Sequence, residues 1–381
     1  MTATGGDRRD MRRTVAAIER GLDERLHIGA QVYAALDGTV CADFAIGEAR
    51  RGVPLAPDSL MLWMSAVKPV IGVAVLQLCQ RGLLQLDDPV CRHLPEFGAG
   101  GKDAVTIRHV LTHTGGFPAV AVQWSDAPWE AILAEICAAP LSADWVPGQR
   151  AAYHIASGWY VLAEVIRRRD GREYSRYVRE AIFEPLGMHD SWIGMPRDRY
   201  RAYGDRVAPM HATEYDPIPH PYWPWAGSAD ACALCRPGGS AWGPARELGR
   251  FYEALLAGGG REDVSILRPE LVAAMTARQT SGMLDETFQV PLDRGLGVVI
   301  DSKRYGAGSA WFGTRCSEQT YGHGGHRCAI AFADPECRLA AAVVFNGMPT
   351  DEAHAKRARA VVDALYQDLD LAVPRTRASQ G

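Results

Sequence analysis

The 381-residue sequence lacks several features that would mark broad classes of protein. Its formal net charge is −4 and no stripe of lysine or arginine is visible, which argues against a nucleic-acid-binding surface. The N-terminus has no apolar segment ahead of a cleavage site, so we expect no secretory signal. The longest apolar run, from Met61 to Cys79, contains Lys68 and Pro69, so we interpret it as a buried helix and not as a membrane span. These absences predict that the partners include no nucleic acid and no membrane.

Cysteine is present but forms no disulfide framework. The nine cysteines are an odd number and are scattered without regular spacing. Cys232 and Cys235 form a lone C-x-x-C, so zinc is the weaker interpretation and free buried thiols are the better one. His109 and His113 have i, i+4 spacing but no third ligand nearby, so we interpret them as histidines that cap a turn. The sequence therefore predicts no metal, no cofactor and a reducing, cytoplasmic setting.

Strand patterns lie at both ends of the chain. After a helical pattern at 10–26, apolar runs at 28–36 and 40–46 flank Asp37-Gly38, a dipeptide that strongly favours a hairpin turn. The C-terminal strand patterns and the closing amphipathic helix fall at 295–300, 321–326, 328–333, 339–345 and 353–369. Strands at both ends with helices between them indicate one sheet built from the two chain ends.

The middle of the chain is mostly helical. The predicted helices include those at 129–139, 174–183, 245–257 and 269–277. We expect an α/β (α+β) fold over 1–381 as one domain, with an antiparallel sheet subdomain from 1–75 and 290–381 and a mostly helical inserted subdomain from 76–289. A long segment rich in proline and aromatic residues, including Trp223, Trp225 and Trp242, either walls a binding site or is an irregular surface cover.

A Ser-x-x-Lys pair heads the longest apolar run. On a helix, positions i and i+3 share a face, so Ser65 and Lys68 would present a hydroxyl and an amine side by side. A serine hydroxyl is a poor nucleophile unless a neighbour takes its proton. A lysine can do so when an apolar environment keeps it partly neutral. The motif is short and arises often by chance, however, and by itself it favours a helix start whose lysine reaches solvent.

Further motifs occur in a fixed order around this pair. They are the segments at 82–90 and 106–116, Pro185-Leu186-Gly187-Met188, Tyr153 after Pro147-Gly148, His323-Gly324-Gly325, and Asp334-Pro335-Glu336. With Ser65-Ala66-Val67-Lys68 they resemble the serine β-lactamase and penicillin-recognising superfamily, in the branch of class C β-lactamases, family VIII esterases and related transacylases. The resemblance covers about residues 14 to 369 and implies a β-lactamase/transpeptidase-like fold.

The resemblance also implies a mechanism. Ser65 would attack a carbonyl and form an acyl-enzyme, and Lys68 and Tyr153 would share the proton transfer. An ammonium near the phenol would lower the pKa of Tyr153. The oxyanion would lie between the backbone N–H groups of Ser65 and His326. Which of Lys68 and Tyr153 acts first as general base stays open.

On the substrate-binding side the chain departs from the family pattern. His323 would line the site, and Gly324 and Gly325 would let the strand backbone approach the substrate. His323 replaces the lysine that meets the carboxylate of a β-lactam, and Ile155 replaces the asparagine that holds the substrate amide. Together with the missing secretory signal, these departures argue against β-lactam hydrolysis as the native function.

Several functions remain open, because function depends on the site and not on the fold. We expect a transacylase that passes an acyl group from a small-molecule ester or amide to an amine or alcohol, in natural-product or antibiotic biosynthesis. The aromatic segment at 215–242 favours this function because it could exclude water. The alternatives are an esterase with water as acceptor, a β-lactamase or D-amino-acid peptidase, and a non-catalytic binding protein. The sequence identifies neither the donor and acceptor nor the oligomeric state.

Overall fold

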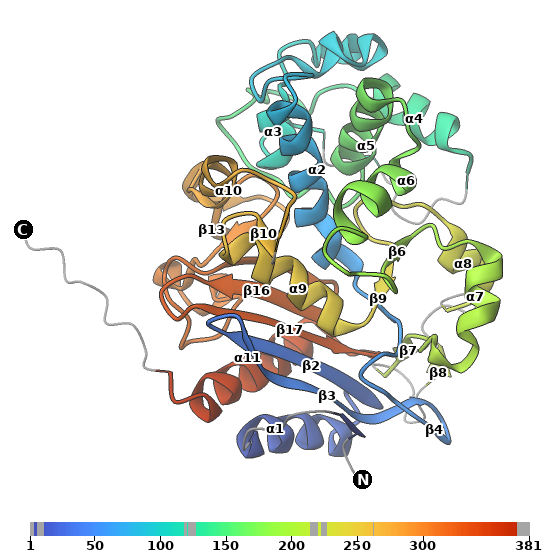
Figure 1. The fold of residues 1–381 in the computed structure, drawn as a ribbon. Helices are drawn as coiled ribbons and strands as arrows, with labels where there is room; N and C mark the ends of the chain where they lie inside the picture. Colours follow the sequence, from blue (N-terminus) through green and yellow to red (C-terminus); the bar gives the residue numbers. More distant parts are fainter. Residues whose placement is uncertain are drawn as a thin grey trace, which may run out of the picture.

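A large antiparallel sheet with helices on its faces supports a helical region (Figure 1). The computed structural model describes residues 4–5, 11–117, 120, 127–213, 220–221, 227–261 and 263–371. Trp223 and Trp225, which the sequence analysis places near the site, lie outside these residues. No helix within the described ranges is both long and apolar enough to cross a bilayer.

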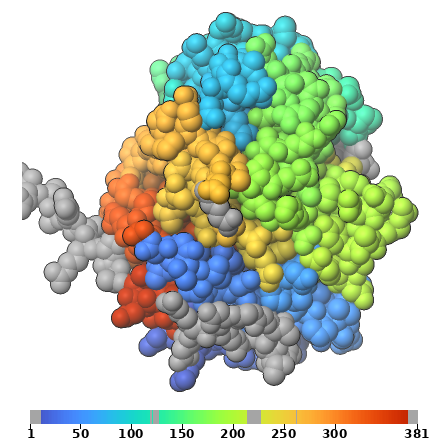
Figure 2. All heavy atoms as spheres, viewed as in Figure 1, coloured from blue at the N-terminus to red at the C-terminus, as the bar shows by residue number. Residues whose placement is uncertain are grey.

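The sheet joins the two ends of the chain. β2 (Gly29–Leu36) pairs with β17 (Leu339–Phe345), with Tyr33 opposite Ala342. In Figure 2 the blue atoms of the N-terminal strands lie directly beside the orange and red atoms of the C-terminal segments. The strand order is β1 (Thr4–Gly5), β3 (Thr39–Arg50), β2, β17, β16 (Ala329–Asp334), β15 (Tyr321–Gly325), β14 (Val299–Ile300), β13 (Val290–Arg294) and β12 (Thr280–Asp285), and β4 (Val53–Pro54) pairs with β3.

Both faces of the sheet are covered. α9 (Ala245–Leu256) packs on one face, and α1 (Arg12–Asp23) and α11 (Asp351–Asp368) pack together on the other (Figure 1). The side chains of β17 alternate between two cores, as the period of a strand requires. Its even-numbered residues join the core shared with α9 and the helical region, and its odd-numbered residues join the core under α1 and α11.

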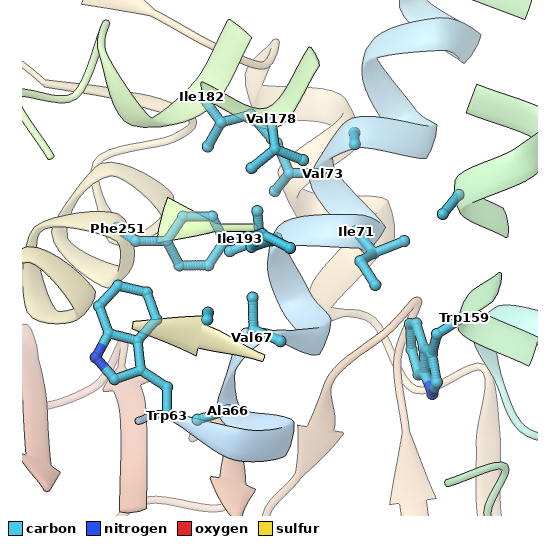
Figure 3. Packing of buried hydrophobic residues seen from close by; sticks show 14 of the residues in the cluster. Trp63, Ala66, Val67, Ile71, Val73, Trp159, Val178, Ile182, Ile193 and Phe251 are labelled. Atoms are coloured by element: carbon cyan, nitrogen blue, oxygen red, sulfur yellow. The ribbon is translucent and has the colours of Figure 1, made fainter. Parts of the chain in front are cut away.

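The helical region is organised around α2 (Lys68–Gln80), which is buried over nearly its whole length. Figure 3 shows Val67, Ile71 and Val73 among side chains from other elements, including Trp159 and Phe251. The other helices are α3 (Ile107–Leu111), α4 (Trp129–Ala138), α5 (Ser157–Asp170), α6 (Tyr174–Val178), α7 (Arg197–Tyr203), α8 (Ala229–Ala233) and α10 (Pro269–Thr276).

Short strands complete the structure. One small sheet consists of β5 (Met61–Leu62), β9 (Ala241–Gly243) and β6 (Trp192–Ile193). A second consists of β18 (Gly347–Met348), β7 (His211–Ala212) and β8 (His220–Pro221), and a third pairs β10 (Gly260–Arg261) with β11 (Val264–Ser265). β5, in the first of these sheets, is followed directly by the segment that contains Ser65.

The predicted fold class is confirmed, and three local predictions need correction. Ser65 lies in the 3₁₀ turn at Met64–Val67, and the α-helix begins only at Lys68, where Pro69 suits the first turn. The strand predicted at 295–300 is reduced to its last two residues, because Gly297 turns the chain with φ +78°. The sheet also takes in β12 and β13, so its C-terminal part begins before residue 290.

Candidate active site

Ser65 lies at a sharp corner between β5 and α2. Met64 just before it has φ +48°, a left-handed conformation that is uncommon for any residue other than glycine. The buried Trp63 anchors the corner, since its indole Nε1 donates to the Gly243 carbonyl at 2.9 Å. The corner therefore presents Ser65 to the cavity that it lines.

Lys68 is the buried partner of Ser65. Its Nζ lies 2.9 Å from Ser65 Oγ and donates to the carbonyls of Ile155 at 3.0 Å and Gly238 at 2.8 Å. Burial lowers the pKa of Lys68 well below its usual value, and the charge of Arg294 lowers it further. In the neutral amine, two hydrogens serve the two carbonyls and the lone pair is left facing the Ser65 hydroxyl.

Tyr153 completes this group. Its side chain is hydrogen-bonded to that of Ser65, and Lys68 Nζ lies 5.1 Å from the centroid of its ring. Burial raises the pKa of Tyr153, and the hydrogen bond with Ser65 and the charge of Arg294 only partly oppose this. The expectation that a lysine ammonium lowers the pKa of Tyr153 is therefore wrong, because burial raises the pKa of Tyr153 and lowers that of Lys68.

A histidine missed as a site residue supports the tyrosine. His113 follows α3 with φ +60°, and its ring lies 4.6 Å from that of Tyr153. Its Nδ1 accepts a hydrogen bond from the His154 backbone N–H at 2.8 Å. The prediction of a turn cap holds for His109, whose Nδ1 accepts from Thr106 N–H at 3.2 Å, but not for His113.

Residues of the β12–β13 hairpin also contact Tyr153. Asp285 Oδ1 accepts from the Tyr153 backbone N–H at 3.3 Å, and Asp285 is paired with Arg294. Both side chains are almost completely buried, and the Arg294 guanidinium lies 5.7 Å from the Tyr153 ring centroid. Neither residue was predicted, because the hairpin itself was not.

The end of β15 approaches the corner at Ser65 very closely. A Cβ on Gly325 would lie 2.2 Å from the Trp63 carbonyl oxygen, so only glycine fits there. Gly324 and His326 also line the cavity, and the imidazole of His326 is partly exposed, 3.8 Å from Asp351. The backbone of His326 thus follows directly on the strand that contacts the Ser65 corner.

His323, on the same strand, is buried and uncharged. Its Nδ1 lies 2.7 Å from the Gly324 carbonyl oxygen, to which it donates. Burial lowers the pKa of His323 well below its usual value, and the charge of Arg294 acts in the same direction. His323 therefore cannot supply the positive charge of the lysine that it replaces in the family pattern.

The two residues that follow Tyr153 lie in different surroundings. The side chain of Ile155 is 42% exposed and lines the cavity, while its carbonyl receives Lys68. The ring of His154 is fully buried, 4.3 Å from that of Phe117, and burial lowers its pKa to about 3. Of these two residues, only Ile155 is therefore available to a substrate.

The cavity around Ser65 has a volume of about 820 Å³. Its walls are largely apolar, and the predicted Trp242 is among them. Other apolar residues of the wall are Leu62, Met64, Ile155, Ala156, Phe288, Val290, Trp311 and Ile330. Within the described parts of the chain, no group of three or more His, Cys, Asp or Glu side chains could hold a metal ion, and Cys232 and Cys235 are free thiols.

A serine bonded to a buried lysine and a tyrosine, next to β15 of an antiparallel sheet, is an arrangement suited to forming an acyl-serine intermediate. The family model described as Beta-lactamase matches residues 15–366, and this chain belongs to that family. The resemblance inferred from the motifs is thus confirmed.

Individual comparisons agree with the family. Esterase EstB of Burkholderia gladioli is 30% identical over 304 residues, which cover 71% of this chain and 75% of that protein. A penicillin-binding protein homologue from Caulobacter crescentus superposes with a TM-score of 0.81 at 28% identity, over 97% of this chain and 100% of the other. A family VIII carboxylesterase shares the fold, with a TM-score of 0.79 at 24% identity over 97% and 100% of the two chains.

Proposed function

We propose that this protein is a serine acyltransferase that forms an acyl-enzyme on Ser65 and passes the acyl group to an amine or alcohol. The donor is a small-molecule ester or amide. The observation that carries the proposal is the geometry at Lys68, whose two carbonyl partners leave one position of its nitrogen for Ser65 Oγ at 2.9 Å. This arrangement suits a neutral amine that accepts the hydroxyl proton.

Acylation then follows from the positions of the three side chains. The Ser65 proton passes to Lys68 Nζ while Oγ attacks the carbonyl carbon, and the N–H groups of Ser65 and His326 receive the oxyanion. Tyr153 is protonated at neutral pH because burial raises its pKa, so it can supply a proton to the leaving group. The proton held by Lys68 then restores the Tyr153 hydroxyl. Each proton is accounted for without a metal or cofactor.

The cavity supports transfer over simple hydrolysis. Its walls are apolar and its volume of about 820 Å³ leaves room for an acyl group and a second substrate. Bound organic acceptors displace water from such a site. Hydrolysis is the second candidate, since EstB, the 30% identical relative, is named as an esterase. A β-lactamase is disfavoured because Ile155 and the neutral His323 offer neither the amide nor the charge that a β-lactam meets.

The cellular context is part of the same proposal. The nine cysteines are free thiols, which supports a reducing compartment such as the cytoplasm. A cytoplasmic acyltransferase with an apolar cavity suits natural-product biosynthesis.

Intact-protein mass spectrometry tests this function. The protein is mixed with a chromogenic short-chain ester, with and without an amine, beside Ser65→Ala and the exposed control Ser265→Ala. We expect an adduct in the wild type and in Ser265→Ala that clears to an amide, and no adduct in Ser65→Ala. Clearance to acid alone would identify an esterase, and the absence of any adduct would favour a binding protein.

A further inference from the structure

One nitrogen of the His323 ring lacks a partner among the described residues. Nδ1 faces the Gly324 carbonyl oxygen at 2.7 Å, and a carbonyl can only accept, so Nδ1 carries the ring hydrogen. Nε2 then has a bare lone pair. It is buried, on a residue that is only 2% exposed, and no described group donates to it. His323 lines the cavity, so a bound substrate is in a position to supply the missing donor.

The position of His323 identifies which part of a substrate can supply that donor. Its ring centroid lies 6.0 Å from the ring of Tyr153, whose hydroxyl is bonded to Ser65, and 6.0 Å from the ring of Trp311 in the cavity wall. His323 therefore lies near Tyr153, which in the proposed mechanism exchanges protons with the leaving group and the incoming acceptor. A hydrogen-bond donor on the acceptor would come close to His323.

We propose that the acyl acceptor of this enzyme is a primary amine and that Nε2 of His323 receives its second N–H. This inference rests on the proposed acyl transfer. The amine lone pair forms the C–N bond while the bond from the acyl carbon to Ser65 Oγ breaks, with its electron pair going to Oγ. One amine proton passes by way of Tyr153 and Lys68 to Oγ. The other stays on nitrogen as the amide N–H and is held by His323.

The arrangement distinguishes acyl acceptors by the number of hydrogens on their attacking nitrogen or oxygen. An alcohol or a secondary amine loses its only hydrogen to Tyr153 and leaves Nε2 unpaired, whereas a primary amine serves both groups. Leaving a buried polar group unpaired is what lets an enzyme reject a close analogue. Water also carries two hydrogens, so hydrolysis is the competing reaction that His323 does not suppress.

Product partitioning tests the inference. The enzyme is acylated with 4-nitrophenyl butyrate and offered benzylamine, N-methylbenzylamine and benzyl alcohol together at one pH, and the products are counted by liquid chromatography and mass spectrometry. The variants are His323→Leu, which removes the acceptor, His323→Gln, which keeps one, and the exposed control His189→Leu. We expect the primary-amine preference to fall about tenfold in His323→Leu and to stay within about twofold of wild type in the other two.

The outcomes distinguish the role of His323 from the proposed acyl transfer. An unchanged preference in His323→Leu overturns the role of His323 and leaves acyl transfer intact. Butyric acid as the sole product of the wild type overturns both. Should His323→Leu fail to fold, ¹⁵N NMR of the wild-type histidines decides: a bare Nε2 and a protonated Nδ1 on His323 support the inference, and the opposite tautomer overturns it.

Discussion

Two regions of the molecule each bury a lysine, and they do so differently. Of the four lysines in the sequence, Lys68 and Lys102 have no exposed surface. Lys102 Nζ donates to three main-chain carbonyls around the C-terminal end of α4. Lys68 donates to two carbonyls, and the third group at its nitrogen is the hydroxyl of Ser65.

The number of carbonyls decides which protonation state each pocket suits. An ammonium has three N–H donors, whereas a neutral amine has two donors and a lone pair. Burial lowers the pKa of both lysines, but only at Lys68 does a second buried cation, Arg294, add to the effect. We infer from the comparison that burial alone would not make a lysine a base, and that one missing carbonyl and one nearby serine would.

The largest expected effect comes from replacing each lysine by methionine. Lys68→Met should slow acylation of Ser65 by about 10³-fold, because the general base is lost. Lys102→Met should keep the acylation rate of the folded enzyme but lower its unfolding free energy by about 3 kcal/mol, because one buried and two partly buried carbonyls lose their donor. Burst kinetics and urea denaturation measure the two effects. Equal loss of rate in both variants would contradict the distinction.

A smaller loss is expected for Tyr153→Phe. The ring would still pack against His113, so folding should be retained, while the hydroxyl that carries a proton to the leaving group is removed. We expect the rate to fall about 10²-fold. Stopped-flow release of 4-nitrophenol provides the measurement. Wild-type kinetics in this variant would remove Tyr153 from the mechanism.

The pH dependence of the acylation rate should report the lowered pKa of Lys68. Acylation needs neutral Lys68, so the rate should rise with pH through the lowered pKa of Lys68 and then level off. Removing the buried pair in the double variant Asp285→Asn/Arg294→Gln takes away a neighbouring cation, which raises the pKa of Lys68. The acid limb of the profile should therefore move to higher pH. A shift in the opposite direction would show that Arg294 does not act on Lys68.

The smallest effect is expected from Ile155→Asn. Lys68 binds the main-chain carbonyl of residue 155, so its environment is retained whatever the side chain. The new amide can hydrogen-bond a substrate amide, and we expect the ratio of amide to ester turnover to rise about fivefold. Competition between a matched ester and amide measures this ratio. An unchanged ratio would mean that the side chain at 155 does not reach the reacting acyl group.

Most of the fold and the central residues of the site could be predicted from local sequence patterns. The hairpin at Asp37-Gly38, the buried β17 and the closing helix follow from periodicity and turn chemistry, and the structure has them nearly where predicted. Ser65, Lys68 and Tyr153 were found because each belongs to a short motif. The structure brings the three together.

The missed features depend on contacts that no local pattern reveals. β12 and β13 lack an apolar run, and Arg294 can be buried only because Asp285 lies opposite it in space. The Gly238 carbonyl that binds Lys68 is a main-chain group and leaves no mark on the sequence. His113 was assigned a local role, since its neighbour Tyr153 is distant in the chain.

The protonation of Lys68 is the central claim, and the chain is well suited to measuring it. With only four lysines, protein labelled at the lysine ε-carbon gives a simple ¹³C NMR spectrum, and Lys68→Met and Lys102→Met assign the two buried signals. At neutral pH we predict that Lys68 shows the chemical shift of a neutral amine while Lys102 shows that of an ammonium. A Lys68 signal that is ammonium-like at neutral pH would contradict the account.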